Sequence, residues 1–150
     1  MKMKLPPDTI FHHDVRLMVF RPRGIITEEW VNRAIELLEK EEDRAEKPFN
    51  RFSDLSKADA IDLDFKFMFR VSLHRRLVYA GHAPVKSAFY VTSEAAARIV
   101  KIHALVTDHS PLKVKMFEDL AAAAKWLGVS LETLELDPRS GNKKSKQKQG

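Results

Sequence analysis

Apolar residues along this chain of 150 residues recur with two alternating periods, one typical of strands and one typical of helices. In residues 9–21 both alternating sets of positions are largely apolar, as in a strand with both faces buried. Further short apolar runs predict strands at 49–55, 86–92 and 113–117. Apolar residues at helical spacing predict helices at 27–45, 62–80, 93–110 and 118–127.

The order of these elements predicts the fold class. Strands that alternate with helices form a mostly parallel sheet with right-handed crossovers and with the helices outside it. We therefore expect one α/β domain over residues 9–137, with a mixed sheet of about five strands and about four helices. The first strand segment should form a hairpin that adds an antiparallel pair at one edge. Residues 1–8 are expected to be an N-terminal extension.

The net charge of +5 is concentrated in the C-terminal tail. Residues 138–150 hold five basic residues and no acidic one, so the rest of the chain is formally neutral. A segment without apolar residues cannot offset the entropy lost on ordering, so we predict that this tail is disordered. Loose lysines attract phosphates only weakly. We expect a solubilising terminus and no specific nucleic-acid binding.

The residue usage also indicates a compartment. The chain has no cysteine, which excludes disulfides and thiolate chemistry and suits a reducing cytosol. Its N-terminus lacks the apolar run of a signal peptide, and no segment reaches the roughly 20 apolar residues of a membrane helix. We therefore expect a cytoplasmic protein without a transmembrane segment.

The motifs of common catalytic sites are missing from the sequence. Its glycines form no phosphate-binding loop, and there is no G-x-S-x-G nucleophile turn. The densest histidine group is His12, His13 and Asp14, but adjacent strand residues point to opposite faces, so the two histidines do not easily share a metal. We expect no enzymatic activity, no cofactor and no metal. An enzyme that uses these three residues is kept as an alternative.

The segment 52–65, FSDLSKADAIDLDF, is the most informative about a binding site. A strand end delivers Asp54 and Ser56, and Asp62 and Asp64 open the next helix. The helix dipole stabilises acidic residues at a helix N-terminus, so capping and loop solvation explain these residues without a ligand. The three aspartates could alternatively gather as oxygen ligands for a cation, although their spacing matches no known loop code.

This segment resembles the core of STAS domains, the fold of anti-sigma-factor antagonists. In that family a strand ends in a D-L-S-like run, and a nearby D-S-S/T-G turn carries the regulatory phosphorylation site at a helix start. The run DLS at 54–56 matches the first part, and Asp62 matches the aspartate of the turn. Leu63 and Asp64 stand at the hydroxyl positions and a phenylalanine replaces the glycine. The resemblance therefore implies a domain without the phospho-acceptor.

The rest of the chain is similar to a divergent branch, the SpoIIAA-like (STAS/SEC14-like) domain family. The shared features are the helix entry at 24–29, the F-x-D-L-S run, the strand KSAFYV and the closing segment at 114–127. The resemblance covers about residues 10–130. It implies a small α/β domain related to lipid-binding SEC14-type folds, without an established reaction.

The predicted second helix is apolar over most of its circumference. A helix of this kind is buried or docked on another surface. We favour a helix that is part core and part homodimer seam, and the alternative is a lid over a pocket. Its basic residues could contact an acidic partner or a lipid head group, or form a solvated face. The candidate binding residues are Asp54, Ser56, Asp62, Asp64, Phe65, Phe69, Arg70, Arg75 and Arg76.

Two functional hypotheses follow besides the enzyme. The favoured one is a non-enzymatic STAS-like interaction or regulatory module that self-associates or binds a regulatory protein. The alternative is a small SEC14-like domain for a lipid or other apolar anionic ligand, with Arg70, Arg75 or Arg76 at the head group. This alternative requires a cavity of roughly 300 Å³ or more beneath the second helix.

Overall fold

The computed structural model describes residues 8–135 of the chain. The tail predicted at 138–150 lies outside the described residues, as does the predicted N-terminal extension except for Asp8. Both predictions stay predictions.

Seven strands and five helices make up the described part of the chain. The strands are β1 (Thr9–His12), β2 (Leu17–Phe20), β3 (Gly24–Thr27), β4 (Asn50–Asp54), β5 (Ala58–Asp62), β6 (Val85–Tyr90) and β7 (Leu112–Phe117). The helices are α1 (Glu28–Ala45), α2 (Phe65–Val78), α3 (Glu94–Val106), α4 (Leu120–Leu127) and α5 (Leu131–Glu135).

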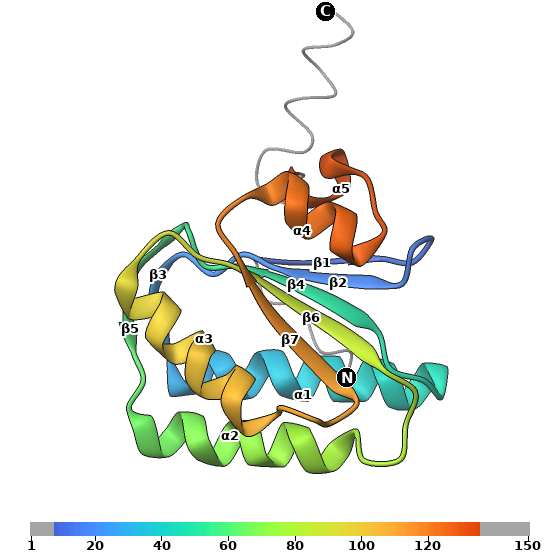
Figure 1. Cartoon of the computed structure of the whole chain (residues 1–150), viewed down its shortest axis with the longest axis horizontal. Coiled ribbons are helices and arrows are strands. Elements are labelled where there is room, and N and C mark those ends of the chain that lie inside the picture. The colour runs from blue at the N-terminus through green and yellow to red at the C-terminus, as the bar shows by residue number, and fades with distance from the viewer. Residues whose placement is uncertain (1–7, 136–150) are drawn as a thin grey trace, which may run out of the picture.

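The main sheet has five strands in the order β1-β2-β4-β6-β7. β1 runs antiparallel to β2, and the other neighbouring strands are parallel. Helices α1, α2 and α3 lie on one side of this sheet and α4 and α5 on the other (Figure 1). The predicted α/β class, the mostly parallel sheet and the antiparallel hairpin at its edge are confirmed.

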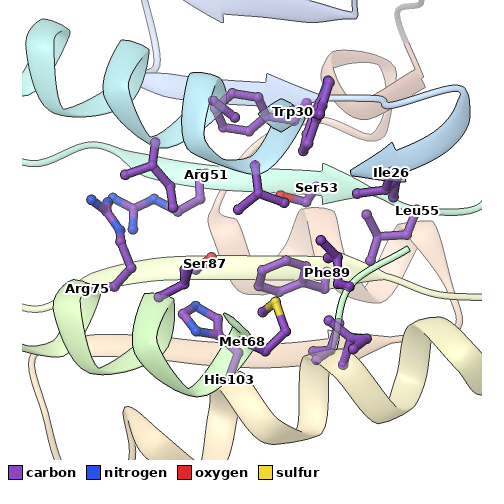
Figure 2. A pocket seen from close by; sticks show the side chains of 18 of the residues that line it. Ile26, Trp30, Arg51, Ser53, Leu55, Met68, Arg75, Ser87, Phe89 and His103 are labelled. Atoms are coloured by element: carbon purple, nitrogen blue, oxygen red, sulfur yellow. The ribbon is translucent and has the colours of Figure 1, made fainter. Parts of the chain in front are cut away.

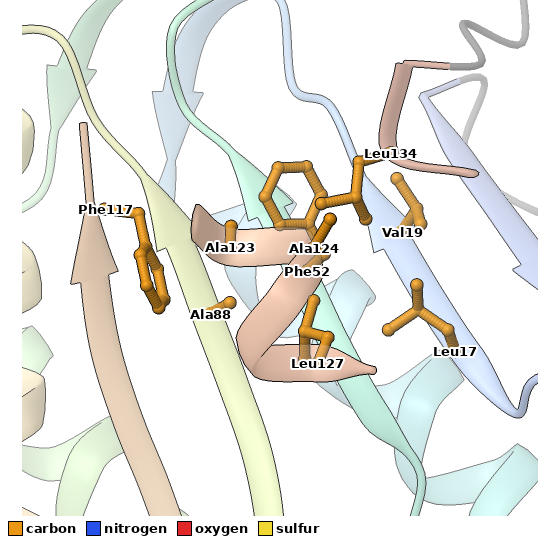
Figure 3. Close-up of a cluster of buried hydrophobic side chains, with 9 residues drawn as sticks. All are labelled: Leu17, Val19, Phe52, Ala88, Phe117, Ala123, Ala124, Leu127 and Leu134. Carbon is orange, nitrogen blue, oxygen red and sulfur yellow. The ribbon is translucent and has the colours of Figure 1, made fainter. Parts of the chain in front are cut away.

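The two faces of the sheet bury two separate sets of side chains. Leu17 and Val19 of β2 pack with Phe52 and with residues of α4 and α5 (Figure 3). Met18 and Phe20 of the same strand belong to a cluster on the opposite face, against α1. Successive strand residues point to opposite faces, which explains why β2 is apolar at every position.

The predicted helix starts are formed by side-chain caps. Thr27 Oγ1 accepts a hydrogen bond from the backbone amide of Trp30 at 3.2 Å, and Ser93 Oγ accepts one from Ala96 at 3.2 Å. Each cap satisfies a backbone donor that the first helical turn leaves without a partner. Gly128 ends α4 with a positive φ of 75°, a conformation that glycine adopts without strain.

Two short strands and one short helix differ from the sequence prediction. β3 and β5 form a separate parallel sheet in which Ile26 pairs with Ile61. Residues 58–62 lie in a predicted loop and at the predicted helix start, so the second helix begins only at Phe65. The β5 residues are polar or small apart from one isoleucine. The extended conformation of this segment therefore depends on its pairing with β3, which is distant in the sequence. The five-residue helix α5 packs on α4 and lies inside the predicted domain range.

Candidate functional site

A cavity of about 130 Å³ lies between the main sheet and helices α1, α2 and α3. Most of its lining is apolar, and the side chains come from all three helices and from both sheets (Figure 2). Representative lining residues are Phe20, Trp30, Ile61, Met68, Phe89 and Val100. A cavity of this size and lining suits a small apolar molecule.

One wall of the cavity is polar. Arg51 and Ser53 lie two residues apart on β4, so both side chains point to the same face of the sheet. Ser87 of β6 is in register with Arg51 on the neighbouring parallel strand and points to that face as well. Figure 2 shows the Arg51 side chain reaching toward Arg75, with Ser53 and Ser87 farther along the two strands among apolar neighbours.

A buried network of charged groups lies behind this wall. The Tyr79 hydroxyl donates to Glu42 Oε1 at 2.6 Å and accepts hydrogen bonds from Arg51 and Arg75. Arg51 Nη2 also donates to Glu42 Oε2 at 3.1 Å, and Arg75 Nη1 donates to Glu39 Oε2 at 2.6 Å. Burial raises the pKa of Tyr79 to about 12, so its hydroxyl stays protonated and can donate. Two guanidinium groups therefore face two carboxylates, and their formal charges cancel.

Three polar groups on the wall lack partners within residues 8–135. The side chain of Arg51 is 5% exposed, and its buried Nε has no hydrogen-bond partner. The hydroxyls of Ser53 and Ser87 also have none in this part of the chain, but unlike Arg51 Nε their oxygens keep some accessible surface. Buried polar groups are usually hydrogen-bonded, so each exception calls for an explanation.

His103 of α3 also lines the cavity. Its Nδ1 is 2.9 Å from Ser72 Oγ of α2, so the two helices meet through a hydrogen bond at this point. Burial lowers the pKa of His103 to about 3, and the nearby Arg75 and Arg51 act in the same direction. The imidazole is therefore neutral near pH 7 and adds no charge to the cavity.

A second hollow lies on the surface behind Tyr79. It is a groove of about 490 Å³ with Glu42, Asp43, Glu46 and Tyr79 among its lining residues. The buried network separates this groove from the cavity. Because its lining is mostly charged, the groove suits an apolar ligand less well than the cavity does.

The structure places Asp54 and Ser56, two predicted binding residues, in a hydrogen-bonded turn after β4. Asp54 is 2% exposed, and its carboxylate is 2.7 Å from a guanidinium nitrogen of Arg21. Its other oxygen accepts hydrogen bonds from the backbone and hydroxyl of Ser56. These contacts hold the ends of β2 and β4 together, and neither predicted residue lines the cavity.

The other two predicted aspartates lie on either side of the start of α2. Asp64 is the N-cap of this helix and accepts a hydrogen bond from the amide of Phe67 at 2.7 Å. Asp62 is exposed at the end of β5. Within residues 8–135 no three histidine or acidic side chains gather as metal ligands, so the alternative cation site is not formed there.

The five predicted residues on α2 lie on different sides of the helix. Phe65 and Phe69 are 65% and 46% exposed and stack on each other, and Arg70 is exposed beside them. Arg76 donates to the backbone oxygens of Val106 and Asp108 at the end of α3. Of the nine predicted site residues, Arg75 alone lines the cavity.

Sequence reasoning missed Arg51, Ser53, Ser87 and His103. One signal was present on β4, where Arg51 and Ser53 flank Phe52 and so point to one face of a buried strand. The position of Ser87 next to Arg51 depends on the register of β4 and β6, which the sequence does not contain.

Comparisons with known proteins support the fold. No protein-family model matches the chain, and no curated protein does. A solved structure of an uncharacterised protein of the DUF3478 family from Shewanella loihica PV-4, described as having a SpoIIAA-like fold, is similar to it. That similarity covers 79% of this chain and 89% of that one, with 19% sequence identity and a TM-score of 0.51. At this identity the likeness shows the fold alone, and the chain has the SpoIIAA-like fold that its motifs predicted.

The described residues were also compared with what a membrane span requires. None of the helices between residues 8 and 135 combines the length and the apolar character needed to cross a bilayer.

Proposed function

We propose that this protein is a small, non-enzymatic binding domain whose ligand occupies the cavity beneath α2. The single observation that carries this proposal is the cavity of about 130 Å³ with an apolar lining and one polar wall. Apolar cavities of about 150 Å³ bind benzene-sized molecules. The ligand class is therefore a compact apolar molecule with a short polar substituent.

The size of the cavity argues against a lipid as the ligand. About 130 Å³ is less than half of the roughly 300 Å³ that the lipid hypothesis requires. The predicted head-group residues also lie in different surroundings. Arg70 is exposed at the surface, whereas Arg75 donates a hydrogen bond to Glu39 inside the protein. We accordingly propose a ligand much smaller than a lipid.

The experiment is an NMR titration of the ¹⁵N-labelled protein with toluene. We expect saturable shifts of amides that surround the cavity. Ile99→Trp should fill the space and abolish these shifts, because Ile99 lines the cavity. The matched control is Ile102→Trp. Ile102 lies on the same helix and is also half-buried, but it does not line the cavity. Shifts that are absent from the wild type, or equal in both variants, would contradict the proposal.

A second candidate function is self-association, and the surface of α2 favours it. Phe65, Phe69, Leu73 and Leu77 recur every four residues and are 41% to 65% exposed. We call these four residues the α2 stripe. An exposed apolar row of this kind is typical of a docking surface.

The charges next to the α2 stripe suit a second copy of the chain. α2 has no acidic residue, whereas α1 has more acidic than basic residues. A groove between the two helices has Glu28 and Glu36 on one side and Arg70 on the other. A twofold axis along this groove would place the basic helix of each copy near the acidic helix of its partner.

Light scattering after size exclusion tests this second candidate. We expect a dimer for the wild type and a monomer for the double variant Phe69→Glu/Leu73→Glu. The control is Lys101→Glu, an exposed position on α3. A wild type that remains monomeric at high concentration would exclude self-association and leave the cavity proposal unaffected.

A further inference from the structure

We infer that the ligand of the cavity presents an uncharged hydrogen-bond acceptor, such as a carbonyl or hydroxyl oxygen, to Ser53 and Ser87. This inference rests on the proposed function and adds the chemistry that the site selects. It also differs from the anionic ligand expected from the basic residues of the second helix.

Donors on the polar wall lack hydrogen-bond partners within residues 8–135. Arg51 Nε is buried and unpaired within residues 8–135, and Arg51 lines the cavity. The hydroxyls of Ser53 and Ser87 lie on the same face of the same two strands. Arg51 Nε has almost no accessible surface and stays out of a ligand's reach, whereas the two serine hydroxyls can donate to an acceptor atom on the ligand.

The charged groups around the cavity leave no counter-charge for an anionic ligand. Arg51 and Arg75 are already paired with Glu42 and Glu39. His103, the remaining titratable group of the lining, is neutral near pH 7. An anion in the cavity would therefore lack a counter-charge, and burying an unpaired charge is strongly unfavourable. A neutral acceptor can take hydrogen bonds from the hydroxyls of Ser53 and Ser87 without this penalty.

The lining of the cavity gives a ligand a defined orientation. Because Arg51 and Ser87 are register partners on parallel strands, the polar wall is a compact patch. Met68, Phe89 and Val100 supply apolar contacts elsewhere in the cavity. A ligand with one polar end and one apolar end therefore fits in a defined orientation, with its oxygen toward β4 and β6.

The test compares probes of similar size that differ in one group. Dissociation constants would be measured by NMR titration at pH 7.5 for toluene, benzaldehyde, benzyl alcohol and benzoate. One net hydrogen bond corresponds to about a five- to tenfold gain in affinity. We expect benzaldehyde and benzyl alcohol to bind more tightly than toluene by this factor, and benzoate to bind most weakly.

A serine double variant tests which residues select the ligand. In Ser53→Ala/Ser87→Ala the ratio of the dissociation constants of toluene and benzaldehyde should shrink at least threefold. The control is Ser110→Ala, a buried serine outside the cavity. If the double variant does not fold, the wild-type probe series still decides the question.

The outcomes separate this inference from the proposed function. Equal affinities for toluene and benzaldehyde would overturn the inference and leave the apolar cavity intact. Tightest binding of benzoate would also overturn it, in favour of an anion. No binding of any probe, toluene included, would overturn the proposed function and the inference together.

Discussion

The hydroxyl of Tyr79, at the C-terminal end of α2, donates a hydrogen bond to Glu42 Oε1 of α1 across 2.6 Å. This contact joins two helices that both line the cavity. The same hydroxyl accepts hydrogen bonds from the guanidinium groups of Arg51 and Arg75. The position of α2 over the cavity therefore depends on a buried polar contact as well as on apolar packing.

Replacing Tyr79 with phenylalanine should destabilise the protein by about 2 kcal/mol or more. The change removes one oxygen and leaves a buried carboxylate and two guanidinium groups each short of a hydrogen bond. Urea denaturation gives the free energy of unfolding. Tyr90→Phe is the control, since Tyr90 is half-buried and its hydroxyl has no hydrogen bond within residues 8–135. Equal losses in the two variants would show that the network adds nothing.

Replacing Asp54 with alanine should cost about 3 kcal/mol. The variant leaves Arg21 buried without the carboxylate that lies 2.7 Å away, and it removes the one oxygen that accepts hydrogen bonds from the amide and the hydroxyl of Ser56. Asp62→Ala, at an exposed position, is the matched control and should stay within about 0.5 kcal/mol of the wild type. A small loss at Asp54 would mean that this aspartate is kept for a partner and not for stability.

The stability of the protein should fall as the pH decreases below 6.5. The pKa of His103 is about 3 in the folded protein, against 6.5 for an ordinary histidine. Between these values the unfolded chain binds the proton and the folded protein does not, so lowering the pH favours unfolding. At pH 4.5 this histidine should lower the free energy of unfolding by roughly 2 kcal/mol relative to pH 7.

The variant His103→Gln should show a shallower dependence of stability on pH between 4.5 and 7. Burial also lowers the pKa of His12, so part of the dependence will remain. His109→Gln, which removes an exposed histidine, is the control for the loss of one histidine. If His103→Gln and the wild type have the same slope, the assigned protonation state of His103 is wrong.

Replacing Asp64 with alanine should destabilise α2 by about 1 kcal/mol, because the carboxylate caps the amide of Phe67. Asp59→Ala, an exposed position on β5, provides the comparison. Amide hydrogen exchange should accelerate in the first turn of α2 for the first variant and not for the second. Unchanged exchange in both would leave Asp64 available for the binding role predicted from the sequence.

The sequence was sufficient for the main architecture because its local signals agree with the fold. Thr27 and Ser93 mark helix starts by their hydroxyls, and β2 is apolar at every position because both of its faces are covered. β3 and β5 could not be predicted in this way. Their pairing joins Ile26 to a distant Ile61, and neither segment alternates clearly between apolar and polar residues.

The candidate site was less predictable than the fold for a physical reason. Asp54 and Asp64 were predicted as binding residues because acidic residues are unusual beside apolar runs. In the fold, however, both accept hydrogen bonds from backbone amides close to them in the chain. Arg51, Ser53 and Ser87 form a site only after two strands align. Whether the predicted surface residues bind a partner stays a prediction.

The central claim is that a compact apolar molecule occupies the cavity beneath α2, and a crystal soaked in bromobenzene tests it most directly. We predict one anomalous bromine peak inside the cavity, among Met68, Phe89 and Val100. The soaked Ile99→Trp variant should lack this peak. An empty cavity in the soaked wild-type crystal would contradict the claim.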